Sequence, residues 1–110
     1  MAYYLYQLSY SHDAIKAMVA NPSDREAAAR KLIEALGGKL HHLFFAFGDH
    51  DVICLIEAPE DTVMMACAAA VASAGTVSGS STVKLMTASD ATAAMALAGK
   101  VTGAYKPPHG

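Results

Sequence analysis

Charged residues are scarce in this chain, and basic residues are the scarcer kind. Asp, Glu, Lys and Arg make up 16% of the 110 residues, with eight Lys plus Arg and a formal net charge of −2. This excludes the basic footprint that binds nucleic-acid phosphates. No uninterrupted apolar run reaches transmembrane length, and the N-terminal MAYYLYQLSYSHD lacks the basic region and cleavage site of a signal peptide. We therefore expect a cytoplasmic protein without nucleic-acid or membrane partners.

Cysteine is almost as scarce. Cys54 and Cys67 stand in apolar segments and lack CxxC spacing, so the sequence does not predict a disulfide framework. A redox pair or a nucleophile is one interpretation. Two small buried hydrophobes is the interpretation that we favour.

Apolar residues, by contrast, make up 54% of the chain. A small domain has much surface relative to its volume and cannot easily hide so many apolar side chains alone. We predict one domain over residues 1–104, a flexible tail over 105–110, and burial of apolar surface against a second subunit.

The order of the predicted elements indicates an α+β fold. Strands are expected over 3–10, 39–48, 51–58 and 76–86, with helices over 14–20, 23–36, 60–74 and 89–100. Pro22 interrupts the first helical region, and we expect Ser23 to cap its second part, with Glu26 completing a capping box. The resulting βαββαβ order and final helix suit a ferredoxin-like sandwich, with an antiparallel sheet and two helices on one face.

A hairpin centred on residue 49 predicts a definite register, with the pairs His42–Ile56, Phe44–Cys54 and Ala46–Val52. One face then carries Leu40, His42, Phe44, Ala46, Val52, Cys54, Ile56 and Ala58. The other carries His41, Leu43, Phe45, Phe47, Asp51, Ile53, Leu55 and Glu57. Both faces are largely apolar, and helices cover only one. We therefore expect a second copy to cover the other, which gives a dimeric α+β barrel.

The histidines do not predict a metal site within one chain. His41 and His42 are neighbours on a strand, so we expect their side chains on opposite faces. His50 lies on the order of 20 Å further along the hairpin, whereas zinc ligands lie within about 2–2.3 Å of the ion. We expect no metal and no cofactor. A metal site whose ligands come from two subunits is the alternative.

Two groups of polar residues are candidates for function. Glu57 faces His41 across the hairpin, and a carboxylate beside an imidazole is a general-base arrangement, so these two are the catalytic candidates. An ordinary ion pair is the alternative. Gln7 on the first strand joins them if that strand flanks the third. Phe45 and Phe47 offer an apolar surface for a ligand, and His50 and Asp51 offer polar groups in a Gly-Asp-His-Asp segment that also suits a tight turn, with Gly48 free to take positive φ.

The segments YYLYQLSYS with AIK, LIEALGGKL, GDHDVICLIEAPED and ASAGTV resemble the GYD-domain family over residues 3 to about 90. The Gly-x-Tyr-Asp motif of that family falls on residues 48–51, with His50 in place of the tyrosine. Asp51, Glu57, Pro59 and Asp61 match the family pattern, and Ala14 stands where glycine is common. The resemblance implies the same ferredoxin-like fold of the dimeric α+β barrel type and little specific chemistry.

Three functions follow as hypotheses. The first is a homo-oligomeric domain that binds a small apolar or aromatic metabolite between its sheets, as an apolar surface with few polar groups suggests. The second is a cofactor-free isomerase or monooxygenase-like enzyme that uses a His–carboxylate pair. The third is a structural assembly module whose alanine-rich helices pack closely between subunits.

Overall fold

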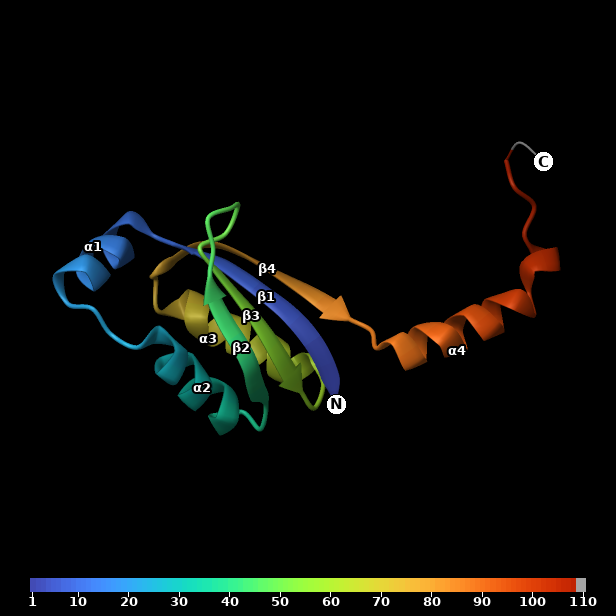
Figure 1. The fold of residues 1–110 in the computed structure, drawn as a ribbon, viewed down its shortest axis with the longest axis horizontal. Coiled ribbons are helices and arrows are strands. Elements are labelled where there is room, and N and C mark those ends of the chain that lie inside the picture. Colours follow the sequence, from blue (N-terminus) through green and yellow to red (C-terminus); the bar gives the residue numbers. More distant parts are fainter. Residues whose placement is uncertain (109–110) are drawn as a thin grey trace.

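A computed structural model describes residues 1–108, so the last two residues of the predicted tail lie outside the described part. The elements are β1 (Ala2–Tyr10), α1 (His12–Ala20), α2 (Arg25–Ala35), β2 (Lys39–Phe45), β3 (Val52–Ala58), α3 (Asp61–Ser73), β4 (Val77–Leu85), α4 (Ala88–Gly99) and a short 3-10 helix (Thr102–Ala104). The predicted order of strands and helices is confirmed, with the first helical region divided around Pro22 (Figure 1).

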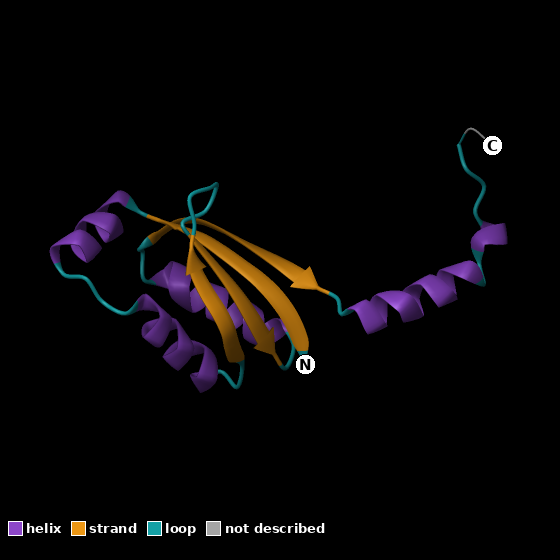
Figure 2. Ribbon diagram, viewed as in Figure 1, coloured by secondary structure: helices purple, strands orange, loops and turns teal. Residues whose placement is uncertain are grey.

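The four strands form one antiparallel sheet in the order β2-β3-β1-β4. This α+β arrangement is compatible with a ferredoxin-like fold, and Figure 2 shows the strands as one curved layer. Helices α2 and α3 cover one face of the sheet. The core lies between these helices and the sheet and consists of Tyr4, Tyr6, Leu8, Ile33, Leu40, Val52, Cys54, Ile56, Ala58, Met64 and Cys67.

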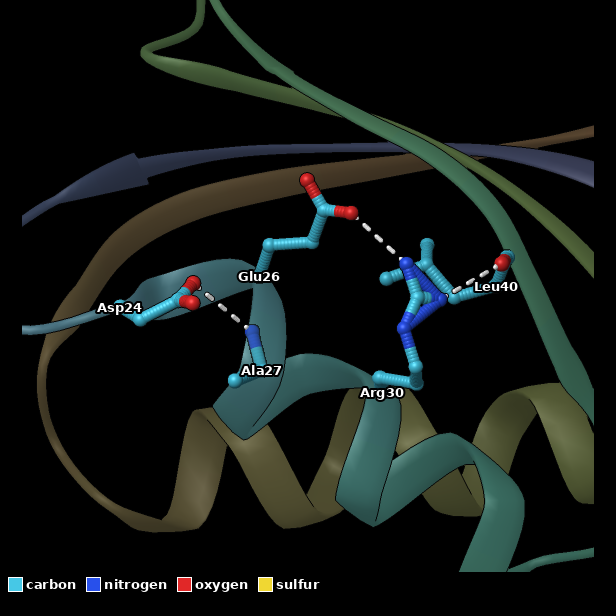
Figure 3. Close-up of polar contacts among 5 residues, drawn as sticks. All are labelled: Asp24, Glu26, Ala27, Arg30 and Leu40. Carbon is cyan, nitrogen blue, oxygen red and sulfur yellow. Dashed lines mark hydrogen bonds and ion pairs between the residues drawn. The ribbon is translucent and has the colours of Figure 1, made fainter.

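Local hydrogen bonds explain where the helices begin and end. Ser11 caps α1, and its side chain accepts a hydrogen bond from the Ala14 amide. The predicted cap of α2 is wrong: Asp24, not Ser23, accepts from the Ala27 amide at 3.0 Å (Figure 3). The helix begins one residue later than expected, and aspartate is as good a cap as serine. Gly37 and Gly75 end α2 and α3 with φ of 83° and 75°, the left-handed conformation that glycine favours there.

The predicted register of the hairpin is wrong, by two residues at Lys39 and Leu40 and by one residue from His42 to Phe45. His42 lies opposite Leu55 instead of Ile56, and Phe44 opposite Ile53 instead of Cys54. A β-bulge interrupts β2 between Leu40 and His42, and an extra residue in one strand shifts every later pair. The connecting loop is also longer than predicted, because β2 ends at Phe45. Gly48, which lies in this loop, does not take the positive φ that its position suggested.

The shift reassigns the two faces of β2. Leu43 and Phe45 lie on the face toward the helices, opposite Cys54 and Val52, and do not share the face of His41 and Glu57 as predicted. The uncovered face, called the open face below, consists of Tyr3, Leu5, Gln7, His41, His42, Phe44, Ile53, Leu55, Glu57, Ser81, Val83 and Leu85. Its edges are the most accessible part, with Phe44 62% and Val83 43% exposed.

Helix α4 extends away from the sheet (Figure 1). It buries no residue, and Met95 and Leu97 are 72% and 63% exposed. The molecule measures 61 × 33 × 22 Å with a radius of gyration of 18.2 Å, against about 13 Å for a compact chain of this size. Within residues 1–108, no helix is both long and apolar enough to cross a membrane.

Candidate functional site

The clearest polar contact on the open face joins His41 and Glu57. The imidazole Nε2 lies 2.9 Å from Oε1 of Glu57, and the two side chains are 25% and 19% exposed. Glu57 lies on β3 between Tyr3 of β1 and Lys39 of β2. His41 is the extra residue of the bulge and has no partner in the strand pairing, and its side chain lies beside this carboxylate. The predicted contact is therefore present, although the register around it differs.

The contact assigns a donor to one imidazole nitrogen. An ionised carboxylate only accepts hydrogen bonds, so Nε2 of His41 donates to Glu57. In a neutral imidazole the other nitrogen, Nδ1, is then the one that can accept a proton. An aromatic ring borders the pair, because the ring of Tyr3 lies 5.7 Å from that of His41 between centroids. This arrangement can orient a polar group or accept a proton.

His42 also lies on the open face, which corrects the prediction that the two neighbouring histidines point to opposite faces. It lies opposite Leu55 and stacks on Phe44, with ring centroids 5.7 Å apart. The bulge is the cause, because it breaks the strict alternation of side chains along β2.

Gln7 occupies the open face but does not join His41 and Glu57. It lies opposite Ile53 of β3 and Ser81 of β4, whereas the neighbour of Glu57 on β1 is Tyr3. Tyr3 and Gln7 are four positions apart on the strand, a distance of about 13 Å. Sequence reasoning missed Tyr3 because its place beside Glu57 depends on the register between strands that are distant in sequence.

The remaining predicted ligand-binding residues lie at the other end of the hairpin. Phe45 faces the helix side and stacks on Tyr10, with centroids 6.4 Å apart, while Phe47 is fully exposed in the loop. His50 Nδ1 lies 3.4 Å from the Ser9 hydroxyl. Asp51 accepts from the Tyr10 amide at 2.9 Å. The structure therefore does not bring these residues together with His41 and Glu57.

Other chemistry on the described residues is limited. No three His, Cys, Asp or Glu side chains in residues 1–108 gather closely enough to hold a metal ion. Cys54 and Cys67 are free and buried, as the favoured interpretation predicted. Burial, and then the neighbouring Cys67, raise the pKa of the Cys54 thiol to about 11, and burial also raises the pKa of Cys67. Neutral thiols of this kind are poor nucleophiles.

A second polar cluster joins β1, α3 and β4. The sequence gives no local pattern that predicts it. The Tyr4 hydroxyl donates to Oδ1 of Asp61 at 2.5 Å, and Lys84 Nζ lies 2.9 Å from the same oxygen. The hydrogen bond to Asp61, together with burial, raises the pKa of Tyr4 to about 12. Hydrogen bonds from Tyr4 and Lys84 lower the pKa of Asp61. The cluster lies on the helix side of the sheet, away from His41.

The family model of the GYD domain matches residues 4–95. The chain belongs to the GYD-domain family. No curated protein and no solved structure matches it. In this GYD-domain protein the motif segment fastens the β2–β3 loop to β1, because Asp51 accepts from the Tyr10 amide and its own amide donates to the Leu8 carbonyl. That contact supports the interpretation of residues 48–51 as a structural turn.

Proposed function

We propose that this GYD-domain protein is a homo-oligomeric cytoplasmic domain that holds a small apolar or aromatic metabolite between two sheets. Two copies pack their open faces together into a dimeric α+β barrel. The observation that carries the proposal is the composition of the open face. Its centre is apolar, at Leu5, Ile53 and Leu55, and one end carries the hydrogen-bonded pair of His41 and Glu57.

The need for a second copy rests on apolar surface without cover. Helices α2 and α3 lie on one side of the sheet only, so the apolar side chains of the open face meet water in a single chain. Surfaces of this kind usually mark interaction sites. The extended α4 supports the same proposal, because a helix of 12 residues is marginal in water without packing partners.

The need for a ligand rests on the polar end of the face. Small-molecule sites combine a largely apolar wall with a few placed polar groups. His41 and Glu57 supply such groups, and Tyr3 adds an aromatic ring beside them. Gln7 and Ser81 supply polar groups further along the same face.

Enzymatic activity is the second candidate function. The free Nδ1 of His41 and the carboxylate that orients its ring suit a general base in a cofactor-free isomerase or monooxygenase-like reaction. A structural assembly module is the third candidate, and the exposed apolar side chains of α4 favour it.

The experiment that tests the proposal compares Glu57→Gln with Asp49→Asn. A metabolite found by thermal-shift screening is titrated against both variants and the wild type by calorimetry. We expect Glu57→Gln to weaken binding about tenfold, because it removes the carboxylate that orients His41. Asp49→Asn lies in the exposed loop and serves as the control. Equal affinity for wild type and Glu57→Gln would exclude this pair from the site.

A further inference from the structure

A cavity of about 120 Å³ lies inside each chain, between the sheet and helices α2 and α3. Its wall is mostly apolar and includes Leu32, Leu43, Val52 and Val71. It lies on the opposite side of the sheet from the open face, so it is separate from the site proposed above. An apolar cavity of about 150 Å³ can bind benzene. This inner cavity is therefore close to the size of one aromatic ring or one short branched chain.

The wall of the inner cavity carries one charged residue, Arg25. Arg25 is partly buried and forms no ion pair with any residue of the described chain. The next arginine on the same helix differs, because Arg30 pairs with Glu26 at 2.7 Å and donates to the Leu40 carbonyl. Arginine is almost never fully buried without a partner, and its guanidinium is well suited to ion pairs away from bulk water. Arg25 thus offers a guanidinium that an anionic ligand can use.

No anion in the wall competes for this charge. The other ionisable groups there are tyrosine hydroxyls and the thiols of Cys54 and Cys67, and burial keeps both thiols neutral near pH 7. The cavity therefore carries a single positive charge at its wall. Tyr6 and Tyr10 add hydroxyl groups that can donate to an oxygen atom.

Arg25 lies where the cavity approaches the surface. It also lines a shallow groove under α1, together with Val19, Pro22 and Phe45. The short α1–α2 connection passes this place, and a charged group of a ligand can remain near water there. A ligand that enters at this point places its apolar end inward and its charged end at Arg25.

We propose that the inner cavity binds a small apolar monocarboxylate. The ring or branched chain of the ligand fills the cavity, and its carboxylate pairs with the Arg25 guanidinium. Arginine suits this role because its planar fork matches the two carboxylate oxygens. This site is additional to the one on the open face and does not depend on it.

Calorimetry with phenylacetate, benzoate and 3-methylbutanoate tests the carboxylate, with the amide of each acid as its neutral counterpart. We expect at least one acid to bind at least tenfold more tightly than its amide. Arg25→Gln should weaken acid binding at least tenfold and leave amide binding unchanged. The control is Lys31→Gln, an exposed cation on the same helix, which should change neither. Equal affinity for acid and amide, or no binding of any acid at millimolar concentration, would overturn the proposal.

A second measurement locates the ligand. Methyl NMR should show shifts at Val52 and Val71 of the inner cavity and none at Ile53 and Leu55 of the open face. Shifts confined to the open face would overturn this proposal and support the other one. Ala29→Leu, which adds volume to the cavity wall, should remove binding while Arg25 stays in place. Retained affinity in a folded Ala29→Leu protein, with an unchanged circular dichroism spectrum, would also contradict it.

Discussion

Arg30 of α2 donates a hydrogen bond from Nη1 to the carbonyl oxygen of Leu40, 3.1 Å away, where the bulge interrupts β2 (Figure 3). The same guanidinium pairs with Glu26 through its other amino group. The contact ties the helix layer to the one irregular point of the hairpin. The side chain of Leu40 remains in the core there, and His41 remains free to reach Glu57 on the open face.

We predict that Arg30→Ala lowers the free energy of unfolding by about 1–2 kcal/mol, because it removes a hydrogen bond from a charged donor. Chemical denaturation measures this loss. Lys31→Ala, at an exposed neighbouring position, should cost less than about 0.5 kcal/mol. NMR resonances of His41 should also shift in Arg30→Ala and stay in place in Lys31→Ala. Equal losses in both variants would contradict a role for Arg30 at the bulge.

The sequence alone predicts the order of elements because apolar strand segments, helix caps, and the glycines and prolines between them leave strong local patterns. The split of the first helical region at Pro22 and the helix ends at Gly37 and Gly75 belong to this class. The hairpin register is not local in the same way. A bulge leaves no clear pattern in an apolar strand, so Phe44 and Phe45 exchange the faces that strict alternation assigns to them.

The contacts of the candidate site also differ in whether the sequence can predict them. The contact of His41 with Glu57 is predictable, because both residues belong to one hairpin and are 16 residues apart. Tyr3 beside that pair, and Tyr4 on Asp61, are not predictable, because those contacts depend on which strand borders β3 and how it is aligned. The same holds for Arg25, whose role depends on a cavity between two layers.

The contact between Tyr4 and Asp61 predicts a stability difference that depends on pH at both ends of the scale. The pKa of Asp61 is lowered from 3.8 in the folded protein. The stability that its ionised carboxylate contributes is therefore fully present above pH 3.8, and it is lost as the pH falls through the lower folded pKa. The pKa of Tyr4 is raised from 10.0 to about 12, so its contribution is present below pH 10.0 and is lost as pH rises toward 12. Wild type and Tyr4→Phe should therefore differ by a constant amount from about pH 5 to about pH 9, with a smaller difference beyond either limit.

Denaturation curves of both proteins at several pH values measure this difference. Tyr10→Phe, on the same strand, is the control. A difference between wild type and Tyr4→Phe that stays constant down to pH 2 would show that the hydroxyl does not interact with the ionised carboxylate.

The buried thiols predict low reactivity. With its pKa at about 11, Cys54 holds a thiolate fraction on the order of 10⁻³ or less near neutral pH. We expect iodoacetamide at pH 7.5 to leave Cys54 and Cys67 unmodified in the folded protein and to modify both in guanidinium chloride. Mass spectrometry counts the added groups. Rapid labelling of the folded protein would favour the alternative of a reactive cysteine.

The proposed pairing of two open faces predicts which substitution would prevent self-association. Leu55 lies in the middle of that face, and Leu55→Glu places a charge where a second sheet should pack. Met65→Glu is the matched control, because Met65 is a large apolar residue on α3 that is 69% exposed. We expect Leu55→Glu to raise the dissociation constant of the dimer at least a hundredfold, and Met65→Glu to leave it within about threefold of wild type.

Sedimentation equilibrium of the wild-type protein tests the proposed pairing of two open faces most directly. We expect a mass of at least two chains at micromolar concentration, twice 11.4 kDa or more, and a shift toward one chain in Leu55→Glu. A wild-type protein that stays at the mass of a single chain across the micromolar range would contradict the pairing of open faces and the metabolite site between them.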